Sequence, residues 1–252
     1  MPVNSPNLAS ALGLDCPQEP GGRPQVTALI GTGGKTTLLW TLAQSLRHKK
    51  VLACTTTRMF PPERHRYDRF LDQEVLPPCD CATSGITFAG EVREEEGKVG
   101  TISPAFLEQL VARFEMVFIE ADGSRTLPYK GWAAYEPLVP EYTTLTVAVM
   151  PVLPEKALAN DTFVHRLPIF CDISGAHPGQ EILPKHLARL IAHPKGPLKC
   201  AKGKVVLFFN KAESPQDVEK ARTVISLLPQ ECRARFWRIV AGSARDNTAI
   251  PL

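Results

Sequence analysis

The chain has 252 residues, of which 44% are hydrophobic and 22% are charged, and its formal net charge is only +3. These values exclude a generally disordered chain, a fibrous repeat and a protein that binds nucleic acid by charge alone. No apolar run approaches the roughly 20 residues that cross a bilayer, so we expect no membrane segment. Residues 1–22 lack Lys and Arg, which argues against a signal peptide, and the seven scattered cysteines fit a reducing compartment. We therefore expect a cytoplasmic protein.

The first 24 residues predict an N-terminal extension with a short helix at 7–14, ended by a stretch rich in Pro and Gly. From residue 25 onward, strand-type apolar runs alternate with segments of helical periodicity. Strands are predicted at 26–30, 51–54, 116–119, 146–150, 205–209 and 238–241, and helices at 36–48, 104–114, 183–192 and 218–228.

This alternation predicts one α/β domain over 25–252, with a mostly parallel, doubly wound sheet and helices on both faces. Two irregular insertions are expected, near 58–103 and 151–203. Within the first of them, 85–90 and 97–102 predict a hairpin.

The sharpest signal is the segment Gly31-Thr-Gly-Gly-Lys-Thr-Thr37, which follows one predicted strand and precedes a predicted helix. Glycines let main-chain N–H groups converge on a phosphate, and the helix N-terminus adds a favourable dipole. In such a P-loop, Lys35 reaches the β- and γ-phosphates and the Thr36 hydroxyl binds Mg²⁺. The usual pattern has glycine where this chain has Leu29, so the loop is a variant. We expect a P-loop NTPase-like fold whose nucleotide-binding residues include Gly31, Thr32, Gly33, Gly34, Lys35, Thr36 and Thr37.

A second signal, Ile119-Glu-Ala-Asp-Gly-Ser124, ends another apolar strand. P-loop enzymes place an acid at the tip of a neighbouring strand to hold Mg²⁺. We expect Asp122 to share the metal with Thr36, and Glu120 to orient water or the outer shell of the metal. Lys35, Asp122 and Glu120 are then the candidate catalytic residues. The alternative is that both acids only cap the following turn.

Two weaker groups of residues are candidates for binding a second substrate. Thr56 and Thr57 lie just beyond the second strand, where ligands of open α/β sheets bind, although a polar turn explains them equally well. Arg125, Lys130 and Arg166, with Glu136 and His165 nearby, are expected around strand ends and would suit an anionic acceptor. Their alternative is a solvated surface.

The segments Asn210-Lys-Ala-Glu213 and Gly242-Ser-Ala-Arg245 resemble the base-binding elements of GTPases. They predict that Asn210, Lys211 and Glu213 lie near the base. An acid at the last position accepts hydrogen bonds from guanine, but Glu213 is one methylene longer than the usual Asp. The sequence therefore leaves ATP and GTP both open.

Five motifs together resemble the YqeC family: Ile30-Gly-Thr-Gly-Gly-Lys-Thr-Thr37, Thr55-Thr-Thr-Arg-Met-Phe-Pro-Pro62, Ile119-Glu-Ala-Asp-Gly-Ser124, Tyr135-Glu-Pro-Leu-Val-Pro140 and Val164-His-Arg166. The resemblance covers nearly the whole chain from about residue 24. It implies a nucleotide-binding accessory protein in the maturation of a selenium-dependent molybdenum hydroxylase or its cofactor. More distantly, the loop resembles that of Mur ligases, and Glu120-Ala-Asp-Gly123 resembles metallochaperone GTPases.

We therefore expect a Mg²⁺-dependent purine nucleotide-binding protein, a slow NTPase, whose partner is a molybdenum hydroxylase or a maturation protein. Two alternatives stay open: an ATP-dependent small-molecule kinase or ligase, and a non-hydrolysing chaperone gated by nucleotide. Neither a nucleic acid nor a membrane is expected as a partner.

Overall fold

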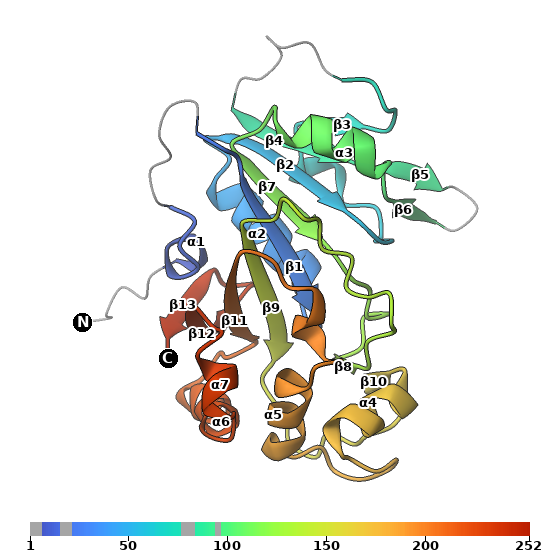
Figure 1. The fold of residues 1–252 in the computed structure, drawn as a ribbon. Helices are drawn as coiled ribbons and strands as arrows, with labels where there is room; N and C mark the ends of the chain where they lie inside the picture. Colours follow the sequence, from blue (N-terminus) through green and yellow to red (C-terminus); the bar gives the residue numbers. More distant parts are fainter. Residues whose placement is uncertain (1–6, 16–21, 77–83, 94–96) are drawn as a thin grey trace.

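A nine-stranded sheet forms the centre of the computed structural model, which describes residues 7–15, 22–76, 84–93 and 97–252 (Figure 1). Neighbouring strands are parallel, except that the last strand along the chain runs antiparallel to its neighbour. The spatial order is β13 (Thr248–Pro251), β12 (Arg238–Ser243), β11 (Lys204–Asn210), β9 (Leu145–Pro151), β1 (Gln25–Gly31), β7 (Met116–Glu120), β2 (Lys50–Thr55), β4 (Gly85–Ala89) and β3 (Arg69–Leu71). The predicted P-loop NTPase-like α/β fold, with its mostly parallel sheet, is confirmed.

Helices cover both faces of this sheet, as expected for a doubly wound fold. One face carries α1 (Leu8–Ala11) and α2 (Lys35–Ser45). The other carries α3 (Pro104–Val111) over β2 and β7, and α4 (Leu167–Ser174), α5 (Pro184–Ala192), α6 (Pro215–Ser226) and α7 (Gln230–Arg233) over the half that contains β9 and β11. Alternate residues of β9 pack against helices on opposite faces of the sheet. Val147 and Val149 pack toward α2, whereas Ala148 packs toward α5.

Small elements connect these layers. The two-residue strands β8 (Tyr129–Lys130) and β10 (Val164–His165) pair in parallel beside the C-terminal edge of the main sheet. The 3₁₀ helices η1 (Arg64–Arg66) and η4 (Pro197–Cys200) lie in the expected insertions. Sequence periodicity did not predict β3, β13 or α4.

The predicted hairpin between 85–90 and 97–102 is wrong. Gly85–Ala89 is β4, which pairs in parallel with β2, and the antiparallel pair is instead β5 (Glu91–Arg93) with β6 (Lys98–Gly100). Phe88 packs beside Trp40 on one face, and Ala89 belongs to the cluster under α3 on the other. An apolar segment covered on both faces is typical of a strand inside a parallel sheet.

No helix in the described ranges combines the length and apolar character needed to cross a membrane. Within the same ranges, the four cysteines are all free thiols: Cys54, Cys171, Cys200 and Cys232.

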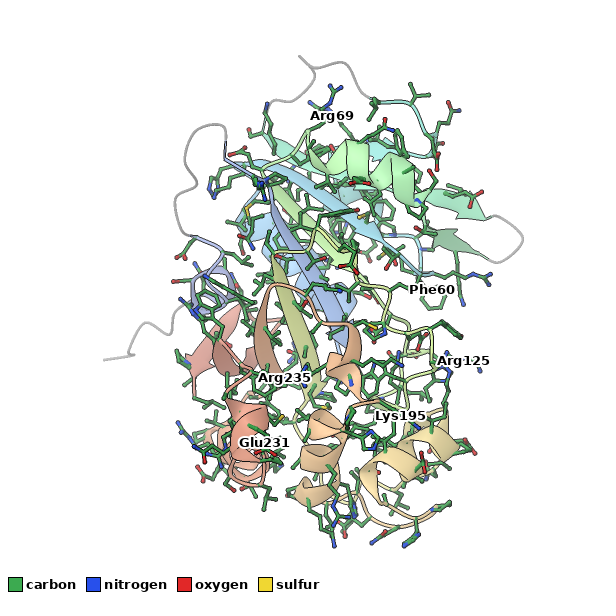
Figure 2. All side chains as sticks on the ribbon, viewed as in Figure 1. Phe60, Arg69, Arg125, Lys195, Glu231 and Arg235 are labelled. Atoms are coloured by element: carbon green, nitrogen blue, oxygen red, sulfur yellow. The ribbon has the colours of Figure 1, made fainter. Side chains whose placement is uncertain are left out.

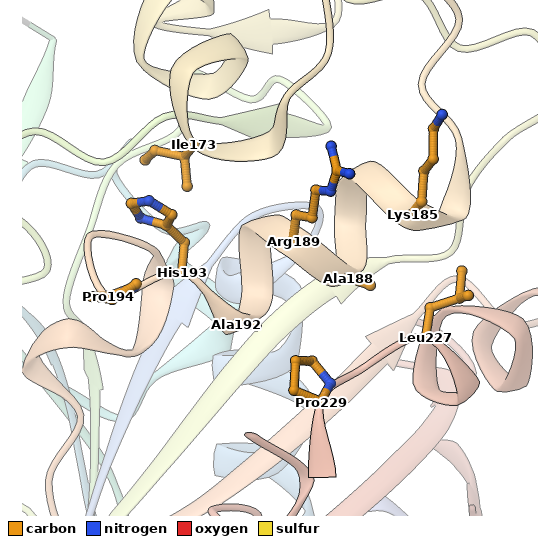
Figure 3. A pocket seen from close by; sticks show the side chains of 9 residues that line it. All are labelled: Ile173, Lys185, Ala188, Arg189, Ala192, His193, Pro194, Leu227 and Pro229. Atoms are coloured by element: carbon orange, nitrogen blue, oxygen red, sulfur yellow. The ribbon is translucent and has the colours of Figure 1, made fainter. Parts of the chain in front are cut away.

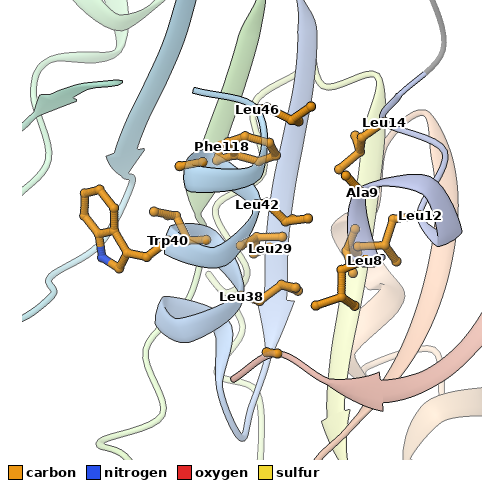
Figure 4. Close-up of a cluster of buried hydrophobic side chains, with 14 of the residues drawn as sticks. Leu8, Ala9, Leu12, Leu14, Leu29, Leu38, Trp40, Leu42, Leu46 and Phe118 are labelled. Atoms are coloured by element: carbon orange, nitrogen blue, oxygen red, sulfur yellow. The ribbon is translucent and has the colours of Figure 1, made fainter. Parts of the chain in front are cut away.

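The N-terminal segment contributes to the main core, although the sequence predicts it as an extension. Leu8 and Leu12 have no exposed surface, and Figure 4 shows them beside α2 and β1. Arg238 of β12 donates to the carbonyls of Ser10 and Ala11, which ties α1 to the edge of the sheet. Most of the Pro- and Gly-rich stretch at 17–24 lies outside the described residues.

Because Leu12 is fully buried, we predict that Leu12→Ala lowers the free energy of unfolding by about 2–5 kcal/mol. Ser10→Ala, on the half-buried side of the same segment, is the matched control and should change it by less than about 0.5 kcal/mol. Urea denaturation followed by circular dichroism measures both. Equal effects of the two variants would show that α1 does not contribute to the core.

Candidate functional site

The candidate site lies where five parallel strands end side by side. β1 ends at Gly31, β7 at Glu120, and β2, β9 and β11 end at Thr55, Pro151 and Asn210. β1 lies between β7 and β9, so the connections of the chain diverge to the two sides of β1 at this edge. Ligands of open α/β sheets bind at such a switch point, beyond the carboxyl ends of the strands.

The connection between β1 and α2 is tight: only Thr32, Gly33 and Gly34 separate the two elements. All three glycines from 31 to 34 have positive φ, and a Cβ on Gly31 would lie 2.1 Å from the carbonyl oxygen of Val149. Leu29 lies inside β1 and packs into the core under α2. The usual first glycine is therefore replaced by a strand residue, and the loop proper begins later than in the standard pattern.

The loop and the first turn of α2 present a row of free main-chain donors. In the described structure, the N–H groups of residues 33–37 donate to no main-chain oxygen, and α2 has no side-chain cap. By contrast, the Thr32 N–H donates to Val149. Gly33 and Gly34 are half-buried and Thr36 and Thr37 are exposed, so a ligand can reach them. Consecutive free N–H groups at a helix N-terminus form the arrangement that binds phosphate.

Thr36 and Glu120 come together at the mouth of the loop. The Thr36 hydroxyl donates to Glu120 Oε2 over 2.7 Å, and Glu120 Oε1 lies 3.8 Å from Lys35 Nζ. Burial raises the pKa of Glu120, and the opposing effects of Lys35 and of the Thr36 hydrogen bond leave it above its ordinary value. A hydroxyl and a carboxylate in contact are oxygen ligands that Mg²⁺ prefers. Among the described residues, this pair fits a metal bound beside the loop.

Asp122 has a different environment, because it is fully buried and surrounded by donors. It accepts from the Gly31 N–H at 3.0 Å and from the Trp132 indole at 2.8 Å, and it lies 3.3 Å from Lys35 and 3.2 Å from Lys130. Burial alone would raise the pKa of Asp122, yet Lys35, Lys130 and the Gly31 N–H hold it below its ordinary value.

Lys35 is also buried in the ligand-free protein. Its ammonium donates to the Gly31 carbonyl at 2.8 Å. Burial lowers the pKa of Lys35, but the carboxylates of Asp122 and Glu120 outweigh it, so the pKa lies above its ordinary value. The lysine is charged, and its present partners are protein groups that a phosphate would have to replace.

A line of alternating charges continues from Asp122 to the surface. Lys130 Nζ contacts Asp122, donates to the Gly123 carbonyl at 2.7 Å and pairs with Glu136 at 3.0 Å. Glu136 in turn accepts from both terminal nitrogens of Arg166, the residue that precedes α4. Sequence reasoning placed Lys130, Glu136 and Arg166 near strand ends, and the structure brings them into direct contact. The sequence did not predict a role for Trp132, because this residue belongs to none of the motifs.

Of the other predicted second-substrate residues, Thr56 lies next to the site, since its N–H donates to the Glu120 carbonyl at 3.1 Å. The Thr56 hydroxyl donates to the Leu138 carbonyl, and the Thr57 hydroxyl contacts that of Thr55, as the polar-turn interpretation expects. Arg125 is exposed at the edge of the molecule (Figure 2). Burial, Arg166 and Arg125 lower the pKa of His165, in this order, which shows that the area around it is positive.

The two segments that resemble base-binding elements lie together. Asn210 Nδ2 donates to the Gly33 carbonyl at 2.7 Å, and its Oδ1 accepts from the Ala244 N–H at 2.8 Å. Glu213 lies beside them, 3.1 Å from Arg245. Asn210 therefore joins the loop to the 242–245 segment, while the Glu213 carboxylate and the exposed Lys211 remain at the surface.

The fold and this site define the chain as a P-loop NTPase-like α/β protein. A family model described as "YqeC protein" matches residues 27–168, from β1 to the start of α4. A protein of Escherichia coli (strain K12), described as "Uncharacterized protein YqeC", is 36% identical over 238 residues, covering 90% of this chain and 91% of that protein. The chain belongs to the YqeC family, as its motifs predict.

The two acids of the 119–124 segment should respond in opposite ways to loss of charge. Asp122→Asn removes the counter-ion of two buried ammonium groups, so we expect it to destabilise the fold by about 3–5 kcal/mol. Glu120→Gln removes a carboxylate whose burial disfavours its charge, so we expect a higher melting temperature for the ligand-free protein. Thermal unfolding at pH 7 compares both with the wild type.

The two acids should also affect the pH dependence of the stability in opposite directions. Because the pKa of Asp122 is lowered on folding, its contribution is present above about pH 4 and is lost as the pH falls below this value. The raised pKa of Glu120 works in the opposite sense: stability decreases as the pH rises above about 4.3. If Asp122→Asn and Glu120→Gln shift the melting temperature in the same direction, these assignments are wrong.

Proposed function

We propose that this protein binds a purine nucleoside triphosphate with Mg²⁺ at the tips of β1 and β7, and that it is a slow NTPase. The row of free N–H groups from 33 to 37 is the observation that carries this proposal. Those N–H groups would donate hydrogen bonds to phosphate oxygens. The Lys35 ammonium would leave the Gly31 carbonyl and the Asp122 carboxylate and contact the phosphates instead.

We assign the metal to Thr36 and Glu120. Their side-chain oxygens are already in contact at the mouth of the loop, whereas Asp122 is enclosed by four donors and has no exposed surface. When bound, Mg²⁺ would neutralise charge on the phosphates. Asp122, predicted from sequence as a metal ligand, is in this proposal a positioning residue for Gly31 and Lys35.

The same contacts support slow turnover. Among the described acids at these strand tips, Glu120 accepts a hydrogen bond from Thr36, and Asp122 accepts hydrogen bonds from several donors. Neither carboxylate is therefore free to orient water. A partner protein would then complete the site. The family resemblance suggests that this partner is a molybdenum hydroxylase or a protein of its maturation. The scattered cysteines support a cytoplasmic location for this function.

The alternative of a kinase or ligase with an anionic acceptor is less well supported. Lys130, one of its three candidate contacts, is fully buried and has three acceptors of its own. Arg166 is held by Glu136. Only Arg125 extends freely into solvent among the three.

We predict that Lys35→Ala weakens binding of a non-hydrolysable Mg²⁺–nucleotide by roughly 10–100-fold, since a charge-assisted hydrogen bond contributes about 1.5–3 kcal/mol. Lys49→Ala, a lysine just beyond the other end of α2, is the matched control and should leave affinity unchanged. Isothermal titration calorimetry gives both values. If Lys35→Ala binds as tightly as the wild type, the proposed site is wrong.

The carboxylate of Glu213 favours guanine, because guanine offers two adjacent N–H donors where adenine offers one. We predict that the protein binds a GTP analogue more tightly than an ATP analogue, and that Glu213→Ala removes the difference. Glu219→Ala, on the exposed side of α6, is the control. Tighter binding of ATP by the wild type would rule out base recognition by Glu213 while leaving the phosphate site untouched.

A further inference from the structure

A hollow of about 450 Å³ lies on the helical layer that covers β9 and β11 (Figure 3). Its walls come from α4, from one side of α5 and from the junction of α6 with α7. None of its lining residues belongs to the strand-tip segments described above. They are Ile173, Lys185, Ala188, Arg189, Ala192, His193, Pro194, Leu227 and Pro229.

Three basic side chains follow one another along this hollow. Lys185 and Arg189 are four residues apart on one side of α5, and His193 is the C-cap of this helix. Figure 3 shows Arg189 between the other two. Within the described chain, neither Lys185 nor Arg189 pairs with a carboxylate, whereas Lys220 and Arg222 of the neighbouring α6 do. Like charges at this spacing destabilise a helix. A ligand with negative charge would offset that repulsion.

The surrounding electrostatics agree with an accumulation of positive charge. Burial lowers the pKa of His186, and Lys185, Arg189 and His177 lower it further. His186 is buried and its Nδ1 accepts from the Leu183 N–H, so it remains neutral and adds no charge. The positive charge of the hollow therefore comes from the side chains that line it.

The rest of the lining is apolar. Ile173, Ala188 and Pro229 form its walls, and Leu227 is 49% exposed at its edge. A volume of about 450 Å³ lies within the range of small-molecule sites. A docked helix would need a longer groove with anchors along several turns. Size, charge and apolar walls together suit a compact molecule with an apolar body and one anionic group.

We propose that this hollow binds a small organic anion, an apolar ring system that bears a phosphate or carboxylate. Arg189 would hold the anionic group, with Lys185 and His193 beside it, because a guanidinium can bind such a group with two parallel hydrogen bonds. The ring would lie against Leu227 at the edge of the hollow. This site goes beyond the proposed nucleotide site and does not depend on it.

The test uses the full chain and 1-naphthyl phosphate as the probe, with binding measured by isothermal titration calorimetry. Inorganic phosphate carries the charge alone, and naphthalenemethanol carries the ring alone. We expect 1-naphthyl phosphate to bind at least tenfold more tightly than either. If inorganic phosphate or the neutral alcohol binds as tightly as 1-naphthyl phosphate, the site does not recognise both the anionic group and the ring, and the proposal is wrong.

Variants locate the binding. Arg189→Glu should weaken 1-naphthyl phosphate at least tenfold, whereas Arg222→Glu, the same change of charge on the exposed side of α6, should not. Leu227→Ala, at a half-exposed position where folding is not at risk, should weaken the naphthyl ester and leave inorganic phosphate unchanged. Binding that Arg189→Glu does not alter lies elsewhere, at the P-loop for example, and would overturn the proposal.

Discussion

The buried carboxylate of Asp122 is the interaction on which the site depends. A charge without water is stable only when paired and hydrogen-bonded, and Asp122 is surrounded by two ammonium groups, an indole N–H and a main-chain N–H. Those donors come from β1, α2 and the 129–132 segment. One side chain thus holds the tip of the P-loop strand, its lysine and the neighbouring loop in a single arrangement.

This arrangement separates the roles of two acids that are only two residues apart. Asp122 lies behind the loop, fully enclosed, and its pKa is lowered by the cations around it. Glu120 lies at the mouth, beside the Thr36 hydroxyl, and its pKa is raised mainly by burial. At neutral pH, the charge of Asp122 therefore stabilises the fold, whereas the charge of Glu120 destabilises it. A divalent cation at the mouth, as proposed, would offset the cost of the buried Glu120 charge and so stabilise the fold.

The charges also connect the loop with the layer of helices over β9 and β11. The line from Lys35 through Asp122, Lys130 and Glu136 ends at Arg166, where α4 begins. The opposite end of α4 contributes Ile173 to the hollow beside α5. One short helix therefore contacts the surroundings of both proposed sites.

Sequence alone determined the parallel α/β fold, the P-loop and its position between strand and helix. These depend on local periodicity and on glycines that only a tight turn requires. The family could also be predicted, because its motifs are contiguous. Periodicity failed at 85–90, because a segment this short fits a hairpin strand as well as it fits β4 of the main sheet.

Long-range packing sets which acid is enclosed and which lies at the mouth of the loop, beside Thr36. In sequence, Glu120 and Asp122 are equivalent acids after one strand, and nothing local distinguishes them. The difference comes from Lys130, Trp132 and the Gly31 N–H, which converge on Asp122 from separate segments. The same holds for Asn210, which bonds to Gly33 across 177 positions of the chain. Burial and hydrogen-bond partners are set by long-range packing, so no sequence pattern could supply them.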